Sequence, residues 1–287
     1  MTAGINDRGE IVGKYKDADG RDHGFLRNRW GRYVRIDVPG AGGTEAYKVN
    51  DRGQVVGSYN PQGPLAGDPG SKGFLFDRGR FTTIEMPGAV YTQALGINNA
   101  GVVVGEYLDN EGNFHGFRWH RGRFRVIEVP GATATSVSDI NDHGDIVGVH
   151  GDSNSIRGFV LRSRPHARFE SFSAPGARYT LALGINNRRQ IVGSGGNDIV
   201  NGSDARGFLL TGSANGTFTP IEIRSTTRTL GTDVNNRRQI VAGIFPAVPQ
   251  QADTAQPMDT TTGMTPTPNS PSADQPTSPQ APPRPET

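Results

Sequence analysis

Five side chains that can carry positive charge occupy one repeated position in this sequence, directly before a Gly-Phe pair. They are His23, Lys72, His115, Arg157 and Arg206. If the repeats form a ring, cations at one position of each repeat surround its axis and can bind an anionic polymer or a sugar acid. The alternative is a cross-strand pair with an acid later in the same repeat. Those acids are Asp37, Glu85, Glu128 and Glu222, whereas the fourth repeat keeps Arg157 but has Ser173.

Alternating carboxylates at Asp17, Asp19 and Asp22 resemble a calcium-binding loop. The glutamate that such a loop needs at its twelfth position is absent, because Asn28 stands there. The alternative is a hairpin turn at residues 19–20, which needs no ion. The chain has no cysteine and its histidines show no ligand spacing, so we expect no cofactor other than calcium at this loop.

Two long segments, residues 59–72 and 194–206, depart most from the repeat. Loops on a regular scaffold often carry binding residues, so Asp68, Asn197 and Asp204 are further candidate ligand contacts. The sequence has no Gly-x-Ser-x-Gly turn and no phosphate-binding glycine loop before a helix, and it predicts no catalytic residue.

The candidate residues are positioned by a repeated structural unit. Its most regular part is a motif of the type Ile-Asn-Asp-x-Gly-x-Ile-Val-Gly, which occurs six times at intervals of 43 to 49 residues. Its asparagines are Asn6, Asn50, Asn98, Asn141, Asn186 and Asn235. Such a period is typical of supersecondary units that bury their faces only against neighbouring copies. We expect each asparagine to cap its own turn, and a polar ring around a channel is the alternative role.

Four short apolar runs follow one another in each unit; in the third they are residues 92–98, 102–107, 116–119 and 124–129. Their Val, Ile, Phe and Tyr content and the Gly, Asn, Asp and Pro between them predict strands. The fold class is therefore all-β, a β-propeller of five to six four-stranded blades, with a parallel β-helix as the rival. The predicted propeller domain covers residues 1–245, with blades at about 4–47, 48–95, 96–138, 139–183 and 184–232 and a half blade at 233–245.

The first two strands of the unit occur six times, but the last two occur five times. Either a five-bladed ring carries a spare hairpin, or a sixth blade takes its outer pair from a segment upstream of Met1, which would make the chain a shortened product.

The turn after each asparagine has a glycine in four copies, Gly9, Gly53, Gly101 and Gly144, and an arginine in the last two. At Arg189 and Arg238 we expect the turn type to shift, so that Asn187 or Asn236 takes the strained conformation.

Residues 246–287 hold 11 of the 20 prolines, and no aromatic residue follows Phe245. This composition predicts a disordered Pro/Thr-rich tail. The net charge is +2 and residues 246–287 carry −3, so the rest of the chain carries about +5; without a basic cluster this argues against a nucleic-acid partner. No apolar run approaches the ~20 residues that cross a bilayer. We expect a monomer without membrane insertion, and the N-terminus shows no signal-peptide pattern.

Residues 5–13, Ile-Asn-Asp-Arg-Gly-Glu-Ile-Val-Gly, followed by His-Gly-Phe-Leu at 23–26, resemble the bacterial extracellular HAF repeat, named after a His-Ala-Phe tripeptide. His23 and His115 stand in its histidine position. The resemblance covers residues 4–245, and it departs in having Gly for the Ala and Lys or Arg for the His in three copies. It implies a secreted or surface-associated, propeller-like protein and brings no catalytic residue.

Three hypotheses for function follow. The leading one is a non-catalytic binding or scaffolding module of the bacterial surface, with a glycan or a surface protein as partner. The second is an enzyme that acts on polysaccharide through two carboxylates at the propeller mouth, which must lie within about 10 Å of one another. The third is a decayed or truncated repeat protein with little selected function.

Overall fold

The computed structural model describes residues 2–63, 68–151, 155–165, 167–198, 203–222 and 228–245. All of them belong to the first of two units of the chain, Met1–Val248; the second is Pro249–Thr287. The predicted disordered tail, residues 246–287, therefore lies outside the described residues. The described part consists of strands and turns, and it contains no helix long and apolar enough to span a membrane.

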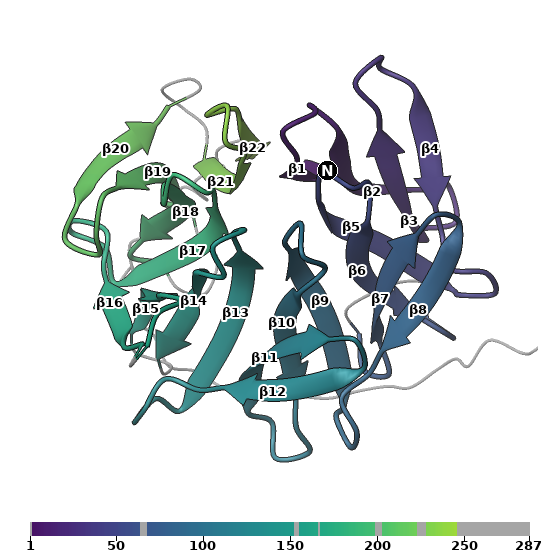
Figure 1. Cartoon of the computed structure of the whole chain (residues 1–287), viewed down its shortest axis with the longest axis horizontal. Coiled ribbons are helices and arrows are strands. Elements are labelled where there is room, and N and C mark those ends of the chain that lie inside the picture. The colour runs from purple at the N-terminus through teal and green to yellow at the C-terminus, as the bar shows by residue number, and fades with distance from the viewer. Residues whose placement is uncertain are drawn as a thin grey trace, which may run out of the picture. The chain divides into compact units, whose positions relative to one another are not determined.

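Four-stranded antiparallel units follow one another along the chain (Figure 1). The first sheet has β1 (Thr2–Ile5), β2 (Ile11–Lys16), β3 (Asp22–Arg27) and β4 (Tyr33–Ile36), and the second has β5 (Gly43–Val49), β6 (Val55–Asn60), β7 (Lys72–Asp77) and β8 (Arg80–Ile84). The third has β9 (Tyr91–Ile97), β10 (Val103–Leu108), β11 (Phe114–His120) and β12 (Arg123–Ile127), and the fourth has β13 (Ala134–Ile140), β14 (Ile146–Gly151), β15 (Ile156–Leu161) and β16 (Phe169–Phe172). The fifth has β17 (Tyr179–Ile185), β18 (Ile191–Gly196), β19 (Arg206–Thr211) and β20 (Thr217–Ile221), and β21 (Arg228–Val234) pairs with β22 (Ile240–Phe245).

Strands that are consecutive in sequence pair with one another, so each sheet is an antiparallel meander. Among the described residues, one parallel pairing, Ile156 with Tyr179, joins the fourth sheet to the fifth. This order confirms the all-β propeller prediction and excludes the parallel β-helix. Each predicted boundary between blades falls inside the first strand of the next sheet, because that strand starts several residues before the asparagine motif.

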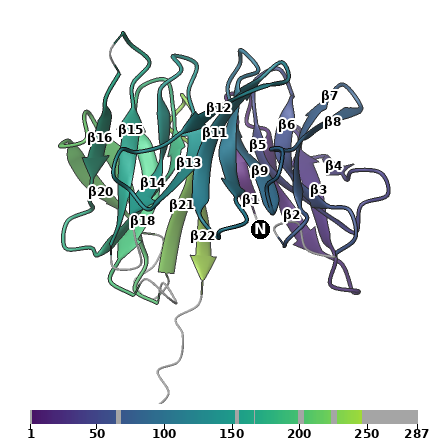
Figure 2. The same cartoon turned by 90° about the horizontal axis from the view of Figure 1, so that it is seen from below.

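The sheets stand around one axis, with the first strands inside and the fourth strands outside (Figures 1 and 2). The core therefore lies between neighbouring sheets. Phe74, Phe117 and Phe159, from the repeated Gly-Phe pair, are fully buried there. The glycine before the ring permits this close packing: a Cβ at Gly116 would lie 2.5 Å from the side chain of Val137 in the next sheet.

The turn after each asparagine keeps one geometry in all six copies, contrary to the expected change of turn type. Arg189 and Arg238 have φ angles of 62° and 65°, against 75° at Gly9. The physical reason is the asparagine, since Asn186 Oδ1 accepts hydrogen bonds from the backbone N–H groups of Arg188 and Gln190, as it does in the glycine copies. The arginine therefore takes the left-handed conformation itself.

We predict that Arg238→Gly increases the free energy of unfolding by about 1 kcal/mol, because it relieves a left-handed arginine whose side chain is exposed. Urea denaturation of both proteins measures the change. Arg189→Gly is the comparison. Its free energy of unfolding should increase by less, because the substitution also removes the hydrogen bond from Arg189 Nε to the buried Asp145, which measures 2.9 Å. Equal or lower stability of the Arg238 variant would contradict the strain argument.

Candidate functional site: the axial face

The six motif asparagines are buried at the inner end of the sheets, and each uses its side chain twice. The Oδ1 atom of Asn6 accepts from the backbone N–H groups of Arg8 and Glu10, both at 3.0 Å, and so shapes the turn. Its Nδ2 group donates to the carbonyl oxygen of Asn50 in the next sheet at 3.0 Å. One side chain thus caps its own turn, as expected, and also joins its sheet to the next one.

This inter-sheet hydrogen bond recurs from copy to copy. Asn50, Asn98, Asn141 and Asn186 donate in turn to the next asparagine carbonyl, at 3.0, 3.1, 3.2 and 3.0 Å. Asn235 then donates to the carbonyl of Asn6 at 2.9 Å, so the relay returns to its first member.

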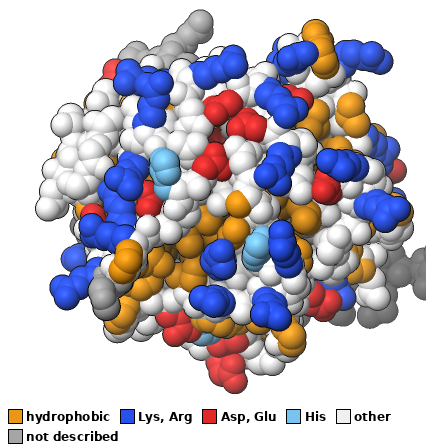
Figure 3. Space-filling view, viewed as in Figure 1, with side chains coloured by type: hydrophobic (Ala, Val, Ile, Leu, Met, Phe, Trp, Pro, Cys, Tyr) orange, Lys and Arg blue, Asp and Glu red, His pale blue; other side chains and the backbone are white. Residues whose placement is uncertain are grey.

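The residue after each asparagine builds a second relay, closer to solvent. Its members are Asp7, Asp51, Asn99, Asp142, Asn187 and Asn236. The side chain of each accepts from the backbone N–H of the preceding member at 2.7 to 2.9 Å. Its side-chain amides also bind carboxylates, as Asn236 Nδ2 does with Asp7 at 2.6 Å. Acidic side chains accordingly gather near the centre of this face (Figure 3).

Below these rings, a buried ion triad joins three sheets across the axis. Lys48 on β5 donates to Asp139 on β13 at 2.7 Å and to Asp233 on β21 at 2.5 Å. Asp139 also accepts from the N–H of Ile185 at 2.9 Å, and Asp233 accepts from the N–H of Ile5 at 2.7 Å. Both aspartates are 1% exposed, so the axis is blocked by paired charges at this depth.

The electrostatics of the triad follow from its burial. Burial alone would lower the pKa of Lys48, but Asp139 and Asp233 outweigh it and raise the pKa. Burial raises the pKa of Asp139 to about 6, against the opposing effect of Lys48.

At the position of the triad residues, every second sheet has a charged residue and the other sheets have glycine. Two residues before the asparagines stand Gly4, Lys48, Gly96, Asp139, Gly184 and Asp233. A Cβ at Gly96 would lie 2.8 Å from the Cα of Asp139, and one at Gly184 would lie 2.9 Å from the Cα of Asp233. The glycines therefore make room for the charged residues of the following sheet. Sequence reasoning missed this site, although the alternation is visible once the six repeats are aligned on asparagine.

The mouth above the triad is shallow. A cavity of about 60 Å³, lined by the two relays and Lys48, opens on this face. It has room for a few water molecules rather than for a sugar ring. The third turn residue is exposed and basic in five copies, Arg8, Arg52, His143, Arg188 and Arg237, and is Ala100 in the other. The exposed basic side chains around the mouth are therefore candidate ligand contacts on this face.

The five cations before Gly-Phe do not surround the axis, because they lie on the third strand of their own sheets. His23 contacts Asp37 at 2.8 Å, Lys72 contacts Glu85 at 2.9 Å and His115 contacts Glu128 at 2.8 Å. These are the cross-strand pairs of the alternative interpretation. Arg157 and Arg206 are exposed, and neither has a carboxylate within ion-pair distance in the described part of the chain.

Each histidine of this set also contacts a second carboxylate, Asp17 for His23 at 2.9 Å and Asp109 for His115 at 2.8 Å. Burial opposes protonation, but the two carboxylates outweigh it and raise the pKa of both rings. The hydrogen bond from His115 in turn lowers the pKa of Asp109 to about 2.

The candidate calcium ligands are not brought together. Asp17 accepts from the backbone N–H groups of Asp19 and Arg21 and holds a turn, while the buried Asp22 pairs with Lys16 at 2.9 Å. Asp19 is exposed. No group of three or more His, Asp or Glu residues is arranged to hold a metal ion in the described ranges.

The loop candidates have separate surroundings. Asp204 accepts from the N–H groups of Asn197 and Asp198 at 2.7 and 3.0 Å, and these bonds lower its pKa against the effect of burial. Asp68 is exposed, and its carbonyl accepts from Ser71. Residues 64–67 and 199–202 of these loops lie outside the described ranges.

Two further acids have perturbed surroundings, the buried Glu45 and the half-buried Glu106. Glu106 on β10 accepts from Ser136 and Tyr91, and burial raises its pKa. Burial also raises the pKa of Glu45 on β5, against the opposing contact with Lys14. Both carboxylates are engaged within the protein.

No family model matches the chain, and no curated protein sequence matches it. Solved structures do resemble it. TolB from Acinetobacter baumannii superposes with a TM-score of 0.56 at 13% identity, over 77% of this chain and 54% of that one, so the chain spans about half of that structure. A triple mutant of AofleA from Arthrobotrys oligospora superposes with a TM-score of 0.53 at 13% identity, over 85% of this chain and 79% of that one. A putative TolB from Agrobacterium tumefaciens superposes with a TM-score of 0.50 at 12% identity, over 74% of this chain and 80% of that one. At these identities the likeness shows the fold, a β-propeller.

We predict that the protein is more stable at pH 4.5 than at pH 7. Because the pKa of Asp139 is about 6 when folded and 3.8 ordinarily, the folded state binds the proton more tightly, and this contribution is lost as pH rises from about 4 through 6. The raised pKa values of Glu45 and Glu106 act in the same direction. Urea denaturation should show a difference on the order of 1–3 kcal/mol.

Asp139→Asn is the control and should flatten this dependence, while below about pH 4 stability should fall as groups such as Asp109 take up protons. A wild-type stability that rises steadily from pH 4.5 to pH 7 would be incompatible with a buried, proton-binding Asp139.

Proposed function

We propose that the protein is a non-catalytic binding module that presents one face of a rigid propeller to an acidic ligand. The observation that carries this proposal is the pattern of that face, in which five of six turns expose a basic side chain around a polar centre. Positive side chains arranged around one axis attract polyanions, whose repeated charges meet several of them together.

The central polar groups support binding rather than catalysis. Asp7, Asp51 and Asp142 each accept hydrogen bonds from neighbouring amides, and the triad carboxylates pair with Lys48. A general acid or nucleophile must reach the substrate, whereas these carboxylates hold neighbouring sheets together. An acidic glycan is the ligand class that we propose.

We propose a bacterial surface or extracellular location and membership of the HAF repeat group on the basis of the repeated motif pair alone. Detection of the endogenous protein in washed-cell and culture-medium fractions, with a cytosolic marker as control, tests the location. Recovery with the cytosolic marker would contradict it.

We also propose that the ring has six blades, the sixth represented by β21 and β22. Three contacts support this: Asn235 to Asn6, Asn236 to Asp7, and the N–H of Ile5 to Asp233. A five-bladed ring with a spare hairpin would leave no structural role for them.

Asn235→Ala tests the blade number. It should lower the free energy of unfolding by about 1–3 kcal/mol, as much as Asn98→Ala does, because both remove a buried amide that serves two sheets. Urea denaturation gives both values. If Asn235→Ala is neutral while Asn98→Ala is costly, the sixth hairpin is not part of the ring.

For ligand binding, the full chain should retain acidic glycans from a mixed glycan array and leave their masses unchanged. Arg52→Glu with Arg188→Glu should weaken this retention at least tenfold, because it reverses two charges of the face. Arg80→Glu with Arg123→Glu is the matched control, since these exposed arginines begin the outer strands β8 and β12. Preference for neutral glycans, or cleavage of any glycan, would overturn the proposal.

A further inference from the structure

A groove of about 560 Å³ lies between the third and fourth sheets. Its base is aliphatic, with Val102, Ile140 and Leu161, and its border is rich in arginine. In Figure 3, hydrophobic side chains bordered by Lys or Arg side chains are visible below the centre of the face. An apolar base with a few charged groups is the usual composition of a small-molecule site.

Two of the border arginines face one another across the sheet. Arg118 on β11 is directly opposite Arg125 on β12. Like charges at such positions destabilise a sheet unless something neutralises them. Among the described residues, neither guanidinium has a carboxylate within ion-pair distance.

The arginine pair is peculiar to the third sheet. At the position of Arg118 the other four sheets have an aliphatic residue, namely Leu26, Leu75, Val160 and Leu209, opposite Val34, Thr82, Glu170 and Thr219. The fold therefore does not require a cation there, and Arg118 replaces a residue that the repeat otherwise keeps apolar.

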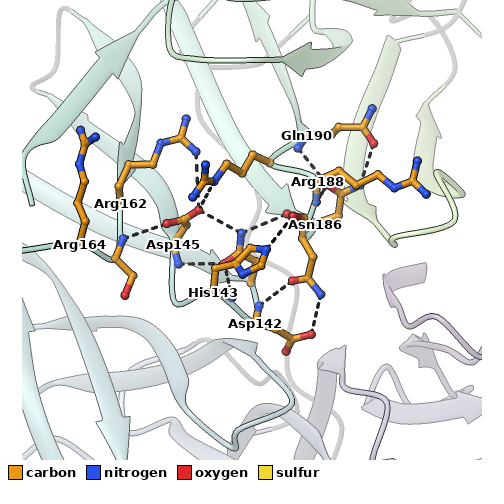
Figure 4. A network of polar contacts seen from close by, with 12 residues as sticks. Asp142, His143, Asp145, Arg162, Arg164, Asn186, Arg188 and Gln190 are labelled. Carbon is orange, nitrogen blue, oxygen red and sulfur yellow. Dashed lines mark hydrogen bonds and ion pairs between the residues drawn. The ribbon is translucent and has the colours of Figure 1, made fainter.

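A third arginine reaches the groove from the fourth sheet. Arg162 is 8% exposed, and its Nη1 atom has no hydrogen-bond partner among the described residues, lying 3.7 Å from Asp145. Asp145 already accepts from the N–H of Ser163 and from Arg189, as Figure 4 shows for this network. A buried guanidinium nitrogen without a partner is costly, so it marks a position for an acceptor.

The charge around the groove is unbalanced. Arg164 pairs with Glu170 at 3.1 Å, and Asp145 is shared between Arg162 and Arg189. Arg118 and Arg125 add two positive charges, and no carboxylate of the described residues lies within ion-pair distance of either. An oxyanion would balance them and could accept bidentate hydrogen bonds from guanidinium groups.

We propose that this groove binds an organic anion, with its carboxylate, sulfate or phosphate group among Arg118, Arg125 and Arg162 and a compact body on the aliphatic base. The inference rests on the proposed function in one respect: it names a specific site and ligand chemistry for the binding module. The anion is either a free small molecule or the acidic unit of a polymer.

Isothermal titration of the full chain with 1-naphthyl phosphate, inorganic phosphate and 1-naphthol tests the site. The first probe should bind at least tenfold more tightly than inorganic phosphate, and 1-naphthol should give no measurable binding. Equal binding of 1-naphthol and 1-naphthyl phosphate, or no binding of either phosphate, would overturn the proposal.

Arg118→Leu is the decisive variant, because it restores the aliphatic residue of the other sheets and should leave the fold intact. It should weaken 1-naphthyl phosphate at least tenfold. Arg123→Leu is the matched control: it removes the same charge from β12 at a position that does not line the groove, and it should bind as the wild type does. Unchanged affinity in folded Arg118→Leu would refute the site.

Competition by oligogalacturonate separates the two sources of the anion. Displacement of 1-naphthyl phosphate identifies an acidic polymer unit, and its absence identifies a free small anion. If the glycan array is negative while 1-naphthyl phosphate binds through Arg118, the proposed glycan function fails and the groove stands. If 1-naphthyl phosphate does not bind, while glycans bind equally to the wild type and to Arg118→Leu, the proposed anion site in the groove is refuted and the glycan proposal stands.

Discussion

The hydrogen bond from each motif asparagine to the next sheet is the contact on which the other features of this fold depend. A propeller sheet buries its faces only against its neighbours, so its inner edge must be fixed in both turn shape and distance. The asparagine does both through one amide, with Oδ1 shaping its own turn and Nδ2 bound to the next. The strained φ of Arg189 and Arg238 shows that this geometry prevails over local backbone preference. The buried triad then distinguishes the otherwise similar sheets from one another, because Lys48 pairs with Asp139 and Asp233.

Much of the fold could be predicted from the sequence, because it depends on local patterns. Short β-branched runs, asparagine-glycine turns and the period of the motif are sufficient to predict the four-stranded units. The cross-strand partners of His23 and Lys72 were also among the stated alternatives, since they lie within one repeat. What the sequence did not reveal are contacts between repeats, which depend on curvature and closure. Lys48 and Asp233 are far apart in the chain and meet only across the axis.

The candidate sites also divide into residues that act within one repeat and residues that lie between repeats. Residues that continue the repeat, such as His115 with Glu128, are used inside their own sheet. Arg118 breaks the repeat where it lines a groove with residues of the fourth sheet, and it has no carboxylate of the described residues within ion-pair distance. A departure from an internal repeat is thus an informative signal in a single sequence, because the other copies show what folding alone requires. The useful comparison is column by column among the six repeats, rather than between the long loops and the rest.

The alternation of glycine with a charged residue along the axis has a consequence for how such a chain can grow. Gly4, Gly96 and Gly184 each accommodate the larger residue of the next repeat, Lys48, Asp139 or Asp233. In the proposed six-bladed ring, this alternation fits because the number of sheets is even. Insertion or loss of one repeat would set two large residues, or two glycines, side by side, giving either a clash or a void at the centre. The repeating unit of this central packing is therefore a pair of sheets rather than a single sheet.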